Sequence, residues 1–71
     1  MTFHEFLLRV ADTQRANPRW RYGQTVFNTL LDTHPEYAEE IRGSEQDPFY
    51  HDSRALPAIM QAAERGLFSE E

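Results

Sequence analysis

Apolar side chains recur at three- and four-residue spacing along the chain, which is the period of a helix that buries one side. The three clearest stripes are Phe3, Phe6, Leu7 and Val10, then Tyr22, Val26, Phe27, Leu30 and Leu31, then Ile59, Met60, Ala63 and Leu67. No segment shows the alternation of a strand. The pattern therefore predicts an all-α fold of about four helices, two longer and two short. Its predicted core is Phe6, Val10, Phe27, Leu30, Ile41 and Ile59.

Local signals mark the ends of these helices. Thr2 and Glu5 have the spacing of a capping box, in which each side chain accepts a hydrogen bond from the other residue's backbone amide. Thr33 and Glu36 repeat this spacing, and Gly43 is expected in the left-handed conformation that follows a helix. The stripes and signals together predict helices over residues 2–16, 21–33, 35–42 and 56–65.

Two further positions carry local information. Gly23 lies in the first turn of the second helix, where glycine costs roughly 1 kcal/mol relative to alanine. We therefore expect another backbone, or Trp20, to approach it closely. Residues 44–53 are rich in turn-forming side chains and are predicted to form a loop. Its two aromatic residues, Phe49 and Tyr50, are expected to dock on the core.

The chain is short, acidic and free of cysteine. Its 71 residues favour one domain over residues 1–71, with the end from about residue 67 frayed. Lys+Arg 7 against Asp+Glu 12 gives a net charge of -5, which argues against binding to nucleic acid. No stretch approaches the ~20 apolar residues of a membrane span, and the start resembles no signal peptide, so we expect a cytoplasmic protein. Because so small a core leaves a thin margin of stability, a homodimer or a protein partner is expected.

No motif in the sequence predicts catalysis, a metal or a cofactor. The histidines, His4, His34 and His51, lack the spacing of zinc ligands, and no cysteine is present. His51 and Asp52 resemble the His-Asp pair of metal phosphohydrolases, but such sites need further ligands and a longer chain. We therefore expect a non-enzymatic protein without cofactor. A small metal-dependent hydrolase is the alternative that this pair leaves open.

Two groups of residues are candidate binding surfaces. The first lies at a helix N-terminus, where free amides attract anions, and it alternates guanidinium groups with aromatic rings. It comprises Arg19, Trp20, Arg21 and Gln24, and it predicts either a small-ligand or nucleotide site or a structural cap on the core. The second is an acidic helix face with the following loop, and it is the predicted protein-binding surface. It comprises Glu36, Glu39, Glu40, Asp47, Tyr50, Asp52 and Arg54.

Between about residues 20 and 60 the chain follows a distinctive pattern. The pattern reads R-x-G-Q-x-x-x-N over residues 21–28, G-S-x-x-D-x-F-Y-x-D over residues 43–52, and then Leu56-Pro57. It resembles a family of small uncharacterised phage and prophage proteins, with Ser44 in place of a threonine and Ala55 as an added residue. The resemblance implies a viral or mobile-element setting, in which small acidic helical proteins often bind and inhibit a host protein. We therefore expect a binding protein that modulates a host or phage protein in the host cytoplasm.

Overall fold

The computed structural model describes residues 1–70. Its elements are α1 (Phe3–Ala16), α2 (Tyr22–Thr33), α3 (Pro35–Ile41), the 3₁₀ turn η1 (Asp52–Arg54) and α4 (Ala55–Glu64). The only β pairing among the described residues is one bridge between Thr2 and Ser69. The prediction of an all-α fold with four helices is therefore confirmed. No helix within residues 1–70 has both the length and the apolar character needed to cross a bilayer.

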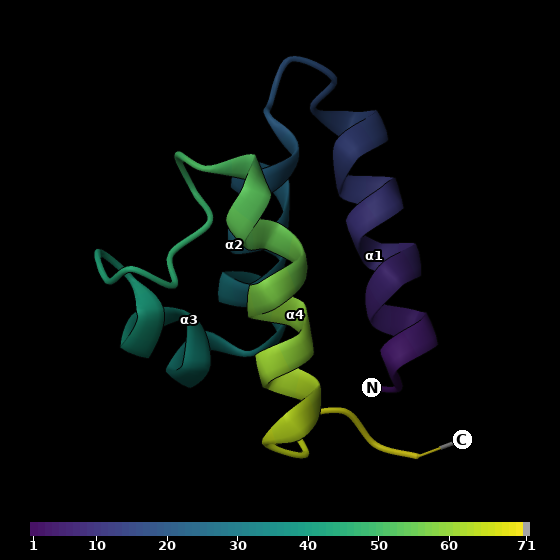
Figure 1. Cartoon of the computed structure of the whole chain (residues 1–71). Helices are drawn as coiled ribbons and strands as arrows, with labels where there is room; N and C mark the ends of the chain where they lie inside the picture. Colours follow the sequence, from purple (N-terminus) through teal and green to yellow (C-terminus); the bar gives the residue numbers. More distant parts are fainter. Residues whose placement is uncertain (71) are drawn as a thin grey trace.

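The central element is α2. Each of the other helices and η1 packs against it, and Figure 1 shows α4 in front of α2 with α1 on one side and α3 on the other. Two threonines of α2 are buried: the Thr29 hydroxyl donates to the Thr25 carbonyl at 2.7 Å, and the Thr25 hydroxyl has acceptors in Gln14 Oε1 of α1, at 3.0 Å, and the Arg21 carbonyl, at 3.1 Å. Because these buried hydroxyls have acceptors in α2 itself or in α1, α2 can be covered on nearly every side.

The core has the predicted membership. The six residues Phe6, Val10, Phe27, Leu30, Ile41 and Ile59 are all buried. Tyr37 joins them, and its hydroxyl donates a 2.7 Å hydrogen bond to the Ala58 carbonyl, which ties α3 to α4. Burial raises the pKa of Tyr37 because the charged phenolate would lose its hydration. Most of the buried side chains of α3 and α4 are small: Ala38, Ala55, Ala58 and Ala62.

One of the two predicted capping boxes forms. The Thr2 amide donates to Glu5 Oε1 at 2.8 Å, and the Glu5 amide donates to Thr2 Oγ1 at 3.0 Å. These hydrogen bonds from Thr2 lower the pKa of Glu5 below its usual value. The box predicted at Thr33 is wrong, because Thr33 is the last residue of α2 and its hydroxyl donates to the Thr29 carbonyl at 2.8 Å. Gly43 has the predicted left-handed conformation, with φ at 74°.

The C-terminal segment, expected to be frayed, lies against the start of the chain. The Phe68 ring packs at a tilt against Phe6 and edge-on against Phe3, with ring centroids 5.1 and 5.7 Å apart, and Leu67 also packs on the core. The Ser69 amide donates to the Met1 carbonyl at 2.9 Å. The two ends of the described chain therefore meet, while the fraying expected from about residue 67 stays a prediction. Residue 71 lies outside the described part of the chain.

Candidate functional site

The loop that follows α3 is held against the start of α2 by a backbone contact. A Cβ added to Gly23 would lie 2.1 Å from the Pro48 carbonyl oxygen, so no larger residue fits without moving the loop. The predicted close approach to Gly23 is thus confirmed, and the partner is a backbone rather than Trp20. Pro48 itself is buried. This contact determines how residues 43–54 sit on the rest of the fold.

The carboxylate of Asp52 strengthens this attachment. The Gly23 amide, in the first turn of α2, donates a 3.0 Å hydrogen bond to Asp52 Oδ1. A negative charge is favourable at a helix N-terminus, where backbone amides lack helical partners. Asp52 therefore occupies the place that the phosphate of a nucleotide would take in the predicted ligand site.

Within the loop, Asp47 and Ser44 bond to nearby backbone groups. Asp47 accepts hydrogen bonds from the amides of Gly43, at 2.8 Å, and Phe49, at 2.9 Å. The Ser44 hydroxyl donates to the Ile41 carbonyl at 2.7 Å and accepts from the Gln46 amide at 3.1 Å. The loop thus carries its own rigid hydrogen-bond network, to which several residues of the sequence pattern belong.

An exposed aromatic residue stands on this rigid base. Phe49 packs edge-on against the core residue Phe27, as predicted, whereas the docking predicted for Tyr50 is wrong, because 71% of Tyr50 is exposed. The Tyr50 ring lies 4.7 Å from that of Phe49 and 5.6 Å from the guanidinium carbon of Arg21. Arg21 also donates to the Phe49 carbonyl at 3.1 Å. Arg21, which was predicted as part of a ligand site, therefore supports Tyr50, which was predicted as part of the protein-binding surface.

A shallow cavity of about 330 Å³ opens beside Tyr50. It is lined by Phe27, Asn28, Leu31, Arg42, Gly43, Asp47, Phe49 and Tyr50. Arg42 lies over the Phe27 ring at 5.4 Å and pairs with Glu39 at 2.8 Å. We call Arg21, Asn28, Arg42, Asp47 and Tyr50 the loop face. Asn28 and Arg42 were not among the predicted site residues, although Asn28 belongs to the sequence pattern and this could have drawn attention to it.

The remaining residues of the predicted protein-binding surface are divided between different places. Glu39 reaches the loop face through its ion pair with Arg42. Glu36 and Glu40 line a separate cavity of about 210 Å³ near α4, where Glu40 pairs with Arg65. Arg54 is half-buried and lines a third cavity of about 170 Å³. The structure thus brings Asp47, Tyr50 and Asp52 together with Arg21, and leaves Glu36, Glu40 and Arg54 apart.

The four residues of the predicted ligand site do not surround a common space. Trp20 is half-buried, with its carbonyl accepting from the Gln14 side chain at 3.0 Å, while Gln24 is half-buried in α2. Arg19 is exposed on the connection between α1 and α2. Within residues 1–70, no three His, Cys, Asp or Glu side chains come close enough together to hold a metal ion.

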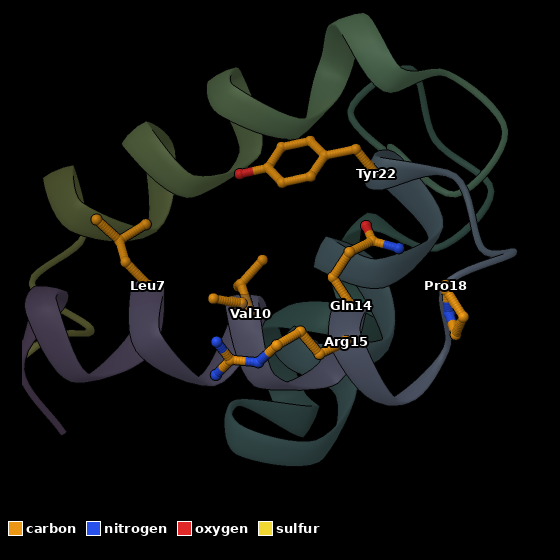
Figure 2. Close-up of a pocket in the computed structure, with 7 residues that line it drawn as sticks. Leu7, Val10, Gln14, Arg15, Pro18 and Tyr22 are labelled. Atoms are coloured by element: carbon orange, nitrogen blue, oxygen red, sulfur yellow. The ribbon is translucent and has the colours of Figure 1, made fainter.

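A second surface of a different kind lies where α1 and α4 run side by side. Leu7 and Tyr22 line a groove there and Leu56 and Met60 are exposed on α4, and we call these four large apolar residues the α1–α4 face. A groove of about 690 Å³ runs along α1, and Figure 2 shows the Tyr22 ring lying between the two helices above Val10. Of these residues, the first apolar stripe of the sequence contains Leu7 and the second contains Tyr22.

The comparisons with known proteins found no matching family model, no matching curated protein and no matching solved structure.

Proposed function

We propose that this protein is a non-enzymatic binding protein that recognises another protein through the loop face. The observation that carries the proposal is the state of Tyr50, which is 71% exposed and yet held by Phe49 and Arg21. A large aromatic side chain that is already ordered loses little entropy on binding, and tyrosine and arginine dominate the energetics of protein interfaces.

The surroundings of Tyr50 supply the polar contacts that orient a partner. Asn28 and Arg42 present an amide and a guanidinium group at the cavity beside the ring. Both groups can bind backbone carbonyls or carboxylates of a polypeptide segment, while Phe27 and Phe49 offer apolar lining. An aromatic anchor beside such a mixed cavity suits a protein segment better than it suits a fully enclosed small molecule.

The competing small-molecule function has less support. A nucleotide at the start of α2 would have to displace the Asp52 carboxylate from the Gly23 amide. It would also need Arg21, whose guanidinium group already contacts Phe49 and Tyr50. We therefore propose that Asp52 and Arg21 hold the loop in place. Their loss would weaken binding of the protein partner because Tyr50 would no longer be held in position.

The setting that we propose comes from the sequence pattern. Its resemblance to small phage and prophage proteins supports a protein that acts inside an infected or lysogenic bacterium, on a host or phage target. The net charge of -5 favours a partner with a basic surface, because opposite net charges accelerate encounter.

The test is capture of a partner from bacterial lysate, followed by affinity measurements with the purified partner. Replacing Tyr50 by Ser should weaken binding at least about tenfold, the change expected when an interface hot spot is lost. Replacing Tyr22 by Ser removes an exposed aromatic from the α1–α4 face and serves as the matched control, with affinity unchanged. Full affinity in the Tyr50→Ser variant, or tight nucleotide binding lost in Arg21→Ala, would overturn the proposal.

A further inference from the structure

The α1–α4 face has two parallel rows of apolar side chains. On α1, Leu7 and the exposed Ala11 are four residues apart, so they lie above one another on the same side of the helix. On α4, Leu56 and Met60 have the same spacing and are 63% and 48% exposed. Figure 1 shows the two helices side by side and running in opposite directions. Both helices pack on α2, so the apolar rows form the rims of a channel over the core.

The two ends of this face differ in charge. Figure 1 places the connection between α1 and α2 at one end, and that connection carries Arg19, while Arg15 in the last turn of α1 is paired with Asp12. The opposite end holds the last turn of α4, with Glu64, together with the segment that reaches Glu70. Four ion pairs form within residues 1–70, and neither Arg19 nor Glu64 takes part in them. The face is therefore apolar along its middle, basic at one end and acidic at the other.

We propose that the α1–α4 face binds a second copy of this chain, turned by a two-fold axis so that the two faces run antiparallel. A two-fold interface brings the same patch against itself, so a surface that is basic at one end and acidic at the other is complementary to its own rotated copy. In that arrangement Arg19 of each chain lies against the partner's Glu64. The parallel arrangement would bring Arg19 against the partner's Arg19 and is opposed by like charge.

The two charged ends of the α1–α4 face are far enough apart that each forms its ion pair independently of the other. The 14 residues of α1 make a helix about 21 Å long, and charges at its two ends are separated by more than the Debye length of about 8 Å at physiological salt. A stable interface covers about 800 Å² per partner, roughly a sixth of the 4615 Å² surface of this chain. A second copy can cover an area of this size, with leucine and methionine side chains buried in the middle of the contact.

Other occupants match the face less well. A basic amphipathic peptide would pair with Glu64 at one end but would meet Arg19 at the other. The dimer uses none of the residues of the loop face, so the experiments that test it are independent of those that test the proposed function. In the dimer both copies of Tyr50 would remain available to a partner.

Sedimentation of the full chain tests the dimer. We expect twice the chain mass of 8.4 kDa at protein concentrations of about 100 μM, with dissociation on dilution. Leu56→Glu and Met60→Glu place a charge in the contact at exposed positions, and each should yield a monomer with an unchanged far-ultraviolet circular dichroism spectrum. Tyr50→Glu is the matched control, since it puts the same charge on the loop face, and it should dimerise like the parent. A monomeric parent, or a dimer that both groove variants retain, would overturn the proposal.

A charge exchange tests the antiparallel arrangement. Arg19→Glu should weaken dimerisation about tenfold, because each dimer contains the contact with the partner's Glu64 twice. Adding Glu64→Arg to the same chain should restore the parent's dissociation constant, since the pair re-forms with its charges exchanged. Equal dimerisation of the single and double variants would overturn the arrangement, and capture of a basic helical peptide by a monomeric chain would overturn the second copy as occupant.

Discussion

The loop face and the α1–α4 face are both exposed, but they are built in opposite ways. Around the loop face, polar groups bond to one another and to α2 over long sequence distances, as Asp52 does with Gly23 and Arg21 with Phe49. On the α1–α4 face, leucine and methionine side chains stand at regular helical spacing over the core. The first surface is shaped by specific contacts and suits selective recognition, whereas the second is shaped by periodicity and suits self-association.

The contrast predicts that the loop face is sensitive to small changes of shape. Replacing Gly23 by Ala would force its Cβ against the Pro48 carbonyl, and we expect the free energy of unfolding to fall by about 3 kcal/mol. Gln24→Ala, at the next position of α2, should change it by no more than about 0.5 kcal/mol. Urea denaturation of the two variants measures both values. A loss in Gly23→Ala as small as that of the control would mean that the loop is not fixed to α2 as described.

A smaller loss is expected when the polar attachment alone is removed. Asp52→Ala leaves the Gly23 amide without its acceptor and should lower the free energy of unfolding by about 1 kcal/mol. Ser53→Ala is the control, because this exposed neighbour lies in the same turn. Chemical denaturation should separate the two variants. If they were equally stable, the carboxylate would add nothing to the attachment.

On the α1–α4 face, an exposed apolar side chain should matter little to the fold of a single chain. Met60→Gln is expected to change the free energy of unfolding by no more than about 0.5 kcal/mol, measured at a concentration at which the chain is monomeric. Its buried neighbour Ile59 gives the contrast, since Ile59→Ala should cost about 2 to 5 kcal/mol. A large loss in Met60→Gln would show that the side chain belongs to the core rather than to an open face.

The smallest effect concerns the start of α1, which borders the α1–α4 face. Hydrogen bonds from Thr2 hold the pKa of Glu5 below its usual value of 4.5, so the unfolded chain binds the proton more readily than the folded one. The contribution of Glu5 to stability is therefore fully present above pH 4.5 and is lost as the pH falls through the lower, folded-state pKa. The melting temperature of Glu5→Gln should lie slightly below that of the parent at neutral pH and converge with it in acid. Glu45→Gln makes the same charge change in the loop and is the matched control.

Features that depend on a few neighbouring residues could be predicted from the sequence. The helices follow from apolar spacing, and the capping box of Thr2 and Glu5 needs only four consecutive residues. The same signal failed at Thr33 because α2 extends through that residue and its hydroxyl bonds within α2. A local motif therefore predicts a helix start only where no earlier helix already uses the same residue.

The candidate site was predictable only in part, because its geometry depends on contacts between distant segments. Gly23 signalled a close approach, but nothing near it in sequence identified Pro48 as the neighbour. Asp52 and Arg21 were assigned to different surfaces, and the fold brings both to the loop. Glu39 and Glu40 are adjacent in sequence, yet they pair with arginines on different sides of α3.

The bridge between Thr2 and Ser69 has a consequence for how the chain can be rearranged. Because these two residues pair side by side, a linker of a few residues could join the ends of the described chain without disturbing the helices. New termini could then be opened at the exposed residues Glu45 and Gln46. Such a circular permutant would keep every helix intact while cutting the loop that carries Tyr50. Partner binding by the permutant would then show whether recognition needs a continuous loop or only the folded helices.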